Sequence, residues 1–458
     1  MKKIKYSKKA VLLSAWALVA VFGLNGCGPQ DAATTNAEKE NSNSRTQSLN
    51  DDAATAAKPE SIYLYQGQPL HSWNIFFRDA ESSEMLKGAH GALPNAKVSV
   101  RASNKDGQED ALTFTWKDSW SAGLSLEGGD PLDLRGYVAE GVLSLDLNVV
   151  ELAKGGLSFK LQCGENCDRR VPFTEQAFAM MGEGWKNIRL PLRCFAHDDD
   201  NFSAVTLPFN LDVGGQGEIS IANVAVVKNA QANASCPDYK TVSTTPGMLK
   251  EFWAREWWEP RHKEKLQRVQ QGNVDLIMLG DSITHGWENE GKEVWEKYYA
   301  ARSPLNIGFS GDRTENVLWR LQHGEVDGLS PKAVVLMIGT NNAGHRQENP
   351  EYIANGIEAI VSELRTRMPE AKVLLLAIFP REEDPDASLR VINDNTNSII
   401  EKFADNQQVF FLDINHVFLD KDGKLSRDIM PDLLHPNENG YALWAEAMEP
   451  TLKQLMEE

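Results

Sequence analysis

The C-terminal half of the chain alternates short apolar runs with longer segments of helical periodicity. The helical segments include Asn316–Gln322, Glu351–Met368 and Leu389–Asp405. Strands that alternate with helices favour a parallel sheet with right-handed crossovers and helices on both faces. We therefore expect a three-layer α/β/α domain whose site lies at the carboxyl ends of the strands. The apolar runs place the strands at residues 274–280, 304–309, 333–339, 372–379 and 409–414.

A serine follows the first of these strands, in Gly280-Asp281-Ser282-Ile283-Thr284. We expect a helix from Thr284 to Tyr299 after it. This place suits a nucleophile, because free N–H groups at a helix N-terminus stabilise a developing oxyanion. Asp281 and Ser282 are also favoured helix caps, so this stretch alone leaves both interpretations open.

Three further polar stretches fall where such strands end. They are Gly308-Phe309-Ser310-Gly311-Asp312, Gly339-Thr340-Asn341-Asn342 and Asp432-Leu433-Leu434-His435. A serine hydroxyl needs a base at neutral pH, and His435 can accept its proton while Asp432 receives the histidine Nδ1–H. The chain has no G-x-S-x-G motif, which argues against the α/β-hydrolase fold.

These four stretches, in this order, resemble the SGNH hydrolases, or GDSL esterase family, over residues of about 270–458. Residues 306–320 and 339–345 resemble the platelet-activating-factor acetylhydrolase branch of that family. The resemblance implies a flavodoxin-like parallel sheet and small-acyl esterase chemistry. No HExxH, P-loop or GxGxxG motif is present, and serine-based hydrolysis needs no metal or other cofactor.

The resemblance also assigns roles to individual residues. It implies a catalytic triad of Ser282, Asp432 and His435. It implies an oxyanion hole made of the backbone N–H groups of Ser282 and Gly311 and the side-chain amide of Asn341. Glycine at position 311 suits this role, because no side chain blocks the approach of substrate to the backbone.

Two more histidines are candidates for the substrate pocket. His285 lies one turn after Ser282, and His345 lies just beyond Asn341. A packing or surface role is the alternative for each. Many members of the family carry Asp after the Asn of the third stretch, where this chain has Asn342. The acetylhydrolase-like branch shares that Asn, so we do not interpret it as loss of activity.

Residues of about 60–230 predict a second domain, because short alternating runs recur between turn signals as in a β-sandwich. The sequence segments at 132–137, 141–144 and 184–195 resemble the galactose-binding-like domain attached to bacterial exo-β-glucanases. That resemblance implies a jelly-roll module and carbohydrate binding. The expected strands include residues 97–101, 112–116, 141–147, 157–161 and 219–224.

Aromatic residues are candidates for sugar stacking, with core packing as the alternative. In the β-region these are Trp73, Trp116, Trp120 and Trp185. A second aromatic group opens the C-terminal domain, and we expect it to serve core or interdomain packing. It consists of Phe252, Trp253, Trp257 and Trp258.

The cysteines predict disulfide bonds. Four remain if Cys27 is lipidated, and an even number in an exported chain implies bridges. Three connectivities are possible. We favour Cys163–Cys167, which are close in sequence, and this leaves Cys194–Cys236. A metal site on the CxxxC motif is the alternative.

The N-terminus predicts export and anchoring. Residues 1–26 combine five lysines with an apolar run that is too short to span a bilayer comfortably, as in a signal peptide. They end in Leu24-Asn25-Gly26-Cys27, which resembles the bacterial lipobox. The resemblance implies lipidation of Cys27 and a place in the bacterial cell envelope, and the absence of Asp after Cys27 favours the outer membrane. An ordinary cleaved signal is the alternative.

Composition marks the remaining boundaries. Residues 27–59 are polar and without apolar periodicity, which predicts a disordered tether. Residues 231–247 have the composition of a linker, between a domain at 60–230 and another at 248–458. The formal net charge is −18 and no basic block lies beyond the N-terminus, which argues against a nucleic-acid partner.

Together these features predict a lipid-anchored serine esterase that removes short acyl groups, acetyl above all, from carbohydrate. One alternative is a lipid-directed acylhydrolase or lysophospholipase. Another is a carbohydrate-binding lipoprotein with an inactive hydrolase domain. The sequence predicts no oligomeric state.

Overall fold

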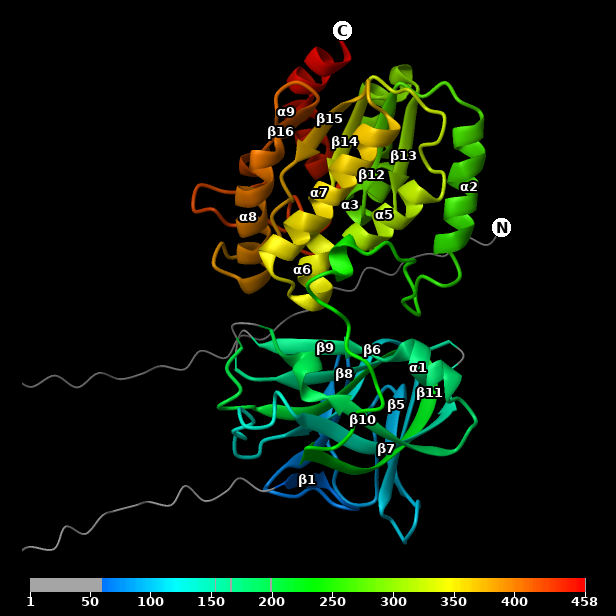
Figure 1. Ribbon diagram of the computed structural model, residues 1–458, viewed down its shortest axis with the longest axis vertical. Helices are drawn as coiled ribbons and strands as arrows, with labels where there is room; N and C mark the ends of the chain where they lie inside the picture. The colour runs from blue at the N-terminus through cyan, green and yellow to red at the C-terminus, as the bar shows by residue number, and fades with distance from the viewer. Residues whose placement is uncertain (1–59, 153, 165–166, 198–199, 458) are drawn as a thin grey trace, which may run out of the picture. The chain divides into compact units, whose positions relative to one another are not determined.

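The computed structural model describes residues 60–152, 154–164, 167–197 and 200–457 (Figure 1). The described residues belong to one compact unit. The segments predicted as a signal peptide and a tether, and the predicted lipidation site at Cys27, lie outside the described residues. No described helix combines the length and the apolar character needed to cross a membrane.

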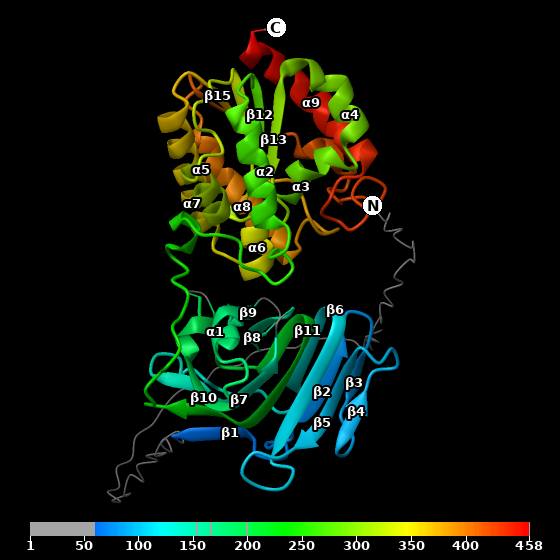
Figure 2. The ribbon, with the colours of Figure 1, turned by 90° about the vertical axis from the view of Figure 1, so that its right-hand side faces the viewer.

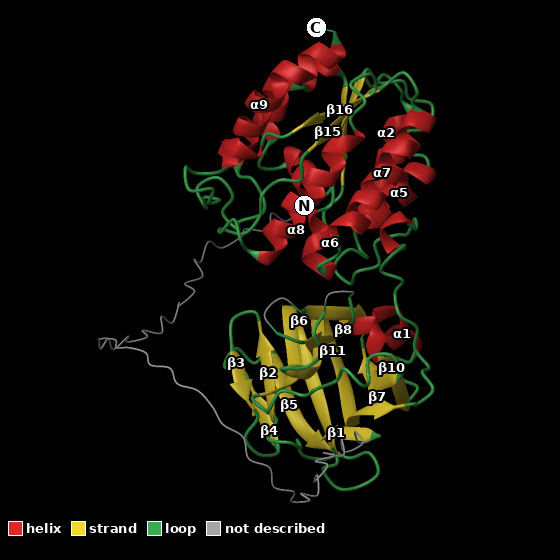
Figure 3. Ribbon diagram, turned by 60° about the vertical axis from the view of Figure 1, so that its left-hand side comes forward, coloured by secondary structure: helices red, strands yellow, loops and turns green. Residues whose placement is uncertain are grey.

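The first half of the described chain is an antiparallel β-domain (Figure 3). It also holds the short helix α1 (Thr174–Ala179). Its strands are β1 (Ser61–Tyr65), β2 (Asn74–Asp79), β3 (Ser83–Met85), β4 (His90–Ala92), β5 (Val98–Ser103), β6 (Ala111–Glu127), β7 (Gly141–Glu151), β8 (Gly156–Gln162), β9 (Asp168–Pro172), β10 (Trp185–Pro191) and β11 (Leu207–Lys228).

Two long strands, β6 and β11, organise this domain. They pair with each other, and the strand on the other side of each one changes halfway along its length. Strand β11 pairs first with β8 and then with β7, while β6 pairs first with β5 and then with β2. The β6–β11 register shifts on both sides of Gly215, whose φ is +73°. Such bulges bend a strand, so both strands pass from one layer of the sandwich to the other at this point.

The four tryptophans of the β-domain differ in how far their side chains are buried. Trp73 and Trp116 are buried in its core, which supports the packing alternative for both. Trp185 is half-buried on β10. Trp120 is 70% exposed and lies on β6 beside the bend. Among the four, Trp120 is therefore the side chain most available to a ligand.

Both favoured disulfides are present. Cys163 is bonded to Cys167, and Cys194 is bonded to Cys236. The pairing is confirmed, and it leaves no thiolate for a metal at the CxxxC motif.

The second half is an α/β domain. Its strands are β12 (Leu276–Gly280), β13 (Pro304–Gly308), β14 (Ala333–Met337), β15 (Lys372–Leu376) and β16 (Val409–Leu412). Its helices are α2 (Trp258–Gln270), α3 (Ser282–His285), α4 (Lys292–Tyr298), α5 (Thr314–Gln322), α6 (Thr340–Arg346), α7 (Pro350–Arg367), α8 (Ser388–Ile400) and α9 (Glu438–Met456).

All five expected strands of this domain are confirmed, and they form one parallel sheet in the order β13-β12-β14-β15-β16. This is the flavodoxin-like order of a doubly wound sheet. Alternate residues of β12 enter two cores. Ile277 and Leu279 pack with α2, α5 and α7, whereas Leu276 and Met278 pack with α4 and α9. Figure 2 shows α5 and α7 on one side of the sheet and α4 and α9 on the other.

The single helix expected over 284–299 is wrong. The segment folds as α3, a 3₁₀ turn at Gly286–Glu288 and α4. The reason is tertiary packing, because Gly286 and Gly291 lie so close to the Tyr441 ring that a Cβ at either position would collide with it. The break turns the chain around Tyr441 and keeps α3 short.

The aromatic group at 252–258 packs as expected at two positions. Trp258 is buried in the core of the α/β domain. Phe252 fills the space beside Gly156 and Gly214 of the β-domain, so it is an interdomain contact. Trp253 and Trp257 are only half-buried.

Candidate active site

Ser282 is the first residue of α3, directly after β12. Asp281 caps the helix, since its fully buried carboxylate accepts a hydrogen bond from the Ile283 N–H at 3.0 Å. Burial raises the pKa of Asp281 to about 7. Asp281 is therefore a structural cap, and Ser282 is left free to face the cleft.

Ser282, His435 and Asp432 form one hydrogen-bonded chain. Ser282 Oγ lies 2.8 Å from His435 Nε2, and His435 Nδ1 lies 2.7 Å from Asp432 Oδ2. A carboxylate only accepts, so Nδ1 carries the proton and Nε2 is free to accept the serine proton. The structure thus brings the three predicted triad residues together.

Hydrogen bonds within the loop itself hold Asp432 and His435 in place. Asp432 Oδ1 accepts the backbone N–H groups of Leu434 and His435, at 3.1 and 2.7 Å. Leu433 between them has a φ of +60°, an uncommon conformation for a branched residue. One short loop therefore fixes both the carboxylate and the imidazole.

The pKa values of this pair move apart. Burial alone would lower the pKa of His435, but the hydrogen bond and charge of Asp432 outweigh it and raise that pKa. Burial would raise the pKa of Asp432, but the hydrogen bonds from His435 lower it. Both shifts favour a charged imidazolium–carboxylate pair, which is the state that forms when His435 takes a proton.

The three expected oxyanion donors follow neighbouring strands. Ser282 begins α3, Gly311 lies in the loop after β13, and Asn341 lies in the first turn of α6. Phe309 N–H donates to Gly280 O at 3.1 Å, which holds the loop after β13 against the end of β12. Asn341 Nδ2 donates to Asp312 O at 3.0 Å and has a second N–H to offer. Among the described residues, neither the Ser282 N–H nor the Gly311 N–H donates to an acceptor.

Gly311 has a φ of +79°, and the Trp253 ring lies where its Cβ would be. Glycine is therefore required here both by the backbone conformation and by the close approach of an indole. The Trp253 contact was not predicted from the sequence.

Sequence reasoning also missed a buried charged network behind residues 309–313, the segment with the proposed oxyanion donor Gly311, which we call the oxyanion loop. Arg320 is completely buried, donates from Nε to Asp312 at 2.8 Å and pairs with Glu325. His262 Nδ1 lies 2.7 Å from Glu325, and Trp258 Nε1 donates to Asp312 at 2.6 Å. The sequence did carry a signal for this network, an arginine inside the apolar run Val317–Leu321. Arginine is rarely buried unless it is paired, so an arginine on a buried helix face indicates carboxylate partners nearby.

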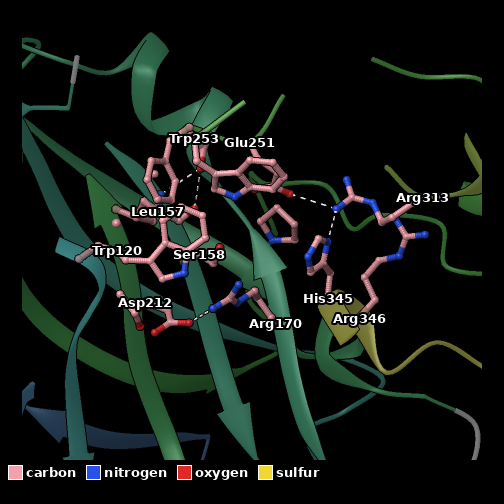
Figure 4. Close-up of a pocket in the computed structure, with 17 residues that line it drawn as sticks. Trp120, Leu157, Ser158, Arg170, Asp212, Glu251, Trp253, Arg313, His345 and Arg346 are labelled. Atoms are coloured by element: carbon pink, nitrogen blue, oxygen red, sulfur yellow. Dashed lines mark hydrogen bonds and ion pairs between the residues drawn. The ribbon is translucent and has the colours of Figure 1, made fainter. Parts of the chain in front are cut away.

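His285 and His345 lie in different places. His285 lines the Ser282 cleft, and its Nδ1 lies 3.0 Å from Ser310 Oγ. Burial, and next the charge of Arg261, lower the pKa of His285 to about 4. His345 lines a separate pocket, where Arg313 donates to its Nδ1 at 3.0 Å (Figure 4). Burial, and next Arg313, hold the pKa of His345 well below its ordinary value.

The Asn342 side chain makes structural hydrogen bonds. Its Nδ2 lies within 3.0 Å of both Ser243 Oγ and Thr314 Oγ1, and its Oδ1 accepts the Thr314 N–H at 3.1 Å. It thus ties the linker before the α/β domain to α5. This departure from the wider family leaves Asn341 untouched.

The cleft over Ser282 has a volume of about 390 Å³. It opens beside the Ser282–His435 pair. Its polar lining residues are Ser282, His285, Asn289, Glu290, Ser310, Asp432, His435 and Asn437.

Comparison with known proteins places both domains. A family profile described as GDSL-like lipase/acylhydrolase matches residues 278–443, and one described as galactose-binding domain-like matches residues 71–226. The platelet-activating factor acetylhydrolase IB subunit alpha2 of Rattus norvegicus is 33% identical over 217 residues, which are 46% of this chain and 91% of the relative.

Two solved structures are among the matches. The extra C-terminal domain of an exo-1,3/1,4-β-glucanase from a Pseudoalteromonas species is 18% identical, covers 38% of this chain and 96% of its own, and has a TM-score of 0.32. A GDSL-like lipase from Bacteroides thetaiotaomicron is 18% identical, covers 42% and 97%, and has a TM-score of 0.36.

Proposed function

Because the chain belongs to the GDSL-like lipase/acylhydrolase family of carboxylic ester hydrolases, we propose that it is a serine esterase for short-chain, chiefly acetyl, esters of carbohydrate. The observation that carries the proposal is the chain from Ser282 Oγ to His435 and Asp432, with distances of 2.8 and 2.7 Å. A neutral imidazole with its free nitrogen on a serine hydroxyl is built to activate that serine.

Acylation begins when Ser282 Oγ attacks the ester carbonyl carbon and its proton passes to His435 Nε2. The oxyanion that forms accepts from the N–H groups of Ser282 and Gly311 and from the free N–H of Asn341 Nδ2. The bond from the carbonyl carbon to the alcohol oxygen then breaks, and His435 gives its proton to that oxygen. The sugar hydroxyl leaves and the acyl group stays on Ser282.

Deacylation runs through the same groups. Water gives a proton to His435 Nε2 as its oxygen attacks the acyl carbon. The bond to Ser282 Oγ breaks, the carboxylic acid leaves, and His435 returns the proton to Ser282. Asp432 keeps its negative charge throughout and stabilises the imidazolium that forms twice in each cycle.

Two observations favour a short acyl group on a polar alcohol. The matched relatives are named as acetylhydrolases. Polar side chains line part of the cleft, among them Asn289, Glu290 and Asn437, and their hydrogen-bonding groups suit a polar alcohol such as a sugar.

A substrate profile of the full-length protein tests the proposal. The panel contains p-nitrophenyl esters of increasing acyl length, acetylated polysaccharides and lysophospholipid, each also given to Ser282→Ala. We expect acetate release from polysaccharide, a preference for acetyl among the p-nitrophenyl esters and no turnover by Ser282→Ala. Preference for long acyl chains or lysophospholipid would replace the proposal with a lipid-directed acylhydrolase. Failure of an organophosphonate to label Ser282 would support an inactive domain.

We also propose that the protein is anchored to the bacterial outer membrane through Cys27. The support is the sequence Leu24-Asn25-Gly26-Cys27 after a basic and apolar segment. Several acyl chains on one residue anchor a protein firmly, whereas one chain binds only marginally. Expression with a labelled fatty acid tests this proposal. Label on the wild type and none on Cys27→Ala is the expected result, and equal label on both would contradict it.

A further inference from the structure

A second pocket lies where the β-domain meets the segment before α2 (Figure 4). We call it the seam pocket, and its volume is about 250 Å³. The β-domain contributes Trp120, Arg170 and Asp212, and the α/β domain contributes Glu251, Trp253 and Arg313. This volume is below the roughly 300 Å³ at which sites for drug-sized ligands begin, so the pocket suits one ring-sized group.

Its apolar wall is made of two indoles. The ring centroids of Trp120 and Trp253 lie 6.1 Å apart at an interplanar angle of 38°. Trp120 is 70% exposed, although a tryptophan of the core is normally well buried. It lies on β6 where the β6–β11 register shifts beside Gly215. An exposed aromatic face of this kind is available to the apolar face of a ligand ring.

The polar wall is charged but compensated. Arg170 pairs with Asp212, and Arg313 donates to Glu251 at 3.2 Å and to Glu315 at 2.8 Å. Figure 4 shows Arg170 with Asp212, and Arg313 with Glu251, beside the two indoles. Because each guanidinium already has a carboxylate partner, the pocket offers fixed donors and acceptors without a large net charge. Hydroxyl groups both donate and accept, so a neutral polyhydroxylated ring matches this wall better than an anion does.

The seam pocket adjoins the loop of Gly311 through Trp253. The Trp253 ring covers Gly311, one of the proposed oxyanion donors. It lies 6.5 Å from the Trp257 ring, which lies 6.0 Å from the ring of His285 in the Ser282 cleft. A row of aromatic rings therefore connects the seam pocket to the cleft.

We propose that the seam pocket is a sugar subsite, built by both domains, that binds a neutral sugar ring of an oligosaccharide whose acylated residue occupies the Ser282 cleft. The inference rests on the proposed function, because it assumes a saccharide substrate. It gives the β-domain a direct part in substrate selection. It also means that esters on longer chains are better substrates than the same ester on a single sugar.

The test compares Trp120→Ala and Arg170→Gln with the wild type, all in the full-length protein. The substrates are p-nitrophenyl acetate and chemically acetylated oligosaccharides of increasing length, derived from xylan, glucan, mannan and galactan. The readout is the ratio of kcat/KM for oligosaccharide to kcat/KM for p-nitrophenyl acetate. Tyr63→Ala is the matched control, since Tyr63 is an exposed aromatic residue of the β-domain outside the pocket.

We expect the wild-type ratio to rise with chain length and to fall about tenfold in Trp120→Ala through a higher KM, as loss of one aromatic contact predicts. Arg170→Gln lowers the ratio in the same direction, and Tyr63→Ala does not. A ratio that is independent of chain length, or unchanged in Trp120→Ala, overturns the subsite while the esterase proposal stands. Hydrolysis of p-nitrophenyl acetate without release of acetate from any saccharide overturns both.

Discussion

Replacement of Asn341 by alanine tests the oxyanion hole against a nearly identical neighbour. Asn341 and Asn342 are adjacent and buried, and both donate hydrogen bonds from Nδ2. Only Asn341 reaches the loop of Gly311, through Asp312 O at 3.0 Å. Asn342 instead contacts Ser243, a residue of the linker.

The structure gives the expected magnitudes. Loss of one oxyanion donor costs about 10²–10³ in kcat, or roughly 2.7–4 kcal/mol. Asn341→Ala also frees the Asp312 carbonyl, so we expect the upper end, about 10³, with about 1 kcal/mol less unfolding free energy. Asn342→Ala removes several buried hydrogen bonds, so we expect about 2–3 kcal/mol less unfolding free energy and a change in kcat of less than about threefold.

The assay measures kcat on p-nitrophenyl acetate and unfolding in urea for both variants. The reasoning predicts that activity and stability separate: Asn341→Ala loses most of its activity and little stability, whereas Asn342→Ala loses more stability and little activity. It is refuted if Asn341→Ala loses less than about tenfold in kcat, or if both variants lose activity equally.

Three further predictions concern charge and covalent structure. Catalysis needs neutral His435, and Asp432 raises the pKa of His435, so kcat/KM should increase with pH with a midpoint above the pKa of an ordinary histidine. Asp432→Asn should move that midpoint to lower pH, and a pH profile that Asp432→Asn leaves unchanged would contradict this. Arg320→Met leaves two buried carboxylates without their cation, so urea unfolding should show a loss of about 3–5 kcal/mol, and a loss below about 1 kcal/mol would refute the role of the network. Cys194 and Cys236 are 42 residues apart, so their replacement by alanine should cost about 4 kcal/mol in calorimetry, and a negligible shift in Tm would count against a structural bridge.

The sheet of the α/β domain could be predicted because its strands are continuous apolar runs. Strands buried on both faces require unbroken apolar runs, and the runs before Gly280, Gly308 and Gly339 marked three of them together with the polar residues at their ends. Family membership confirms the resemblance inferred from the four stretches. The triad assignment stays a prediction, and the 2.8 and 2.7 Å contacts are the geometry that it requires.

What could not be predicted depends on tertiary contacts. The broken helix after Ser282 results from the Tyr441 ring, which is contributed from a distant part of the chain. The network around Arg320 unites α2, α5 and the oxyanion loop, and no spacing in the sequence connects them. Trp120 is exposed beside the irregularity at Gly215, whereas Trp116 on the same strand is buried, and no sequence pattern distinguishes the two.

The central claim is that Ser282 carries the acyl group of a sugar ester during turnover. The most direct measurement mixes the full-length protein with an acetylated oligosaccharide, quenches in acid within milliseconds, and locates acetyl groups on peptides by mass spectrometry. We predict acetyl on the peptide that contains Ser282 in the wild type and none there in Ser282→Ala. Acetate release without acetyl on Ser282, or with equal release by Ser282→Ala, would contradict the account.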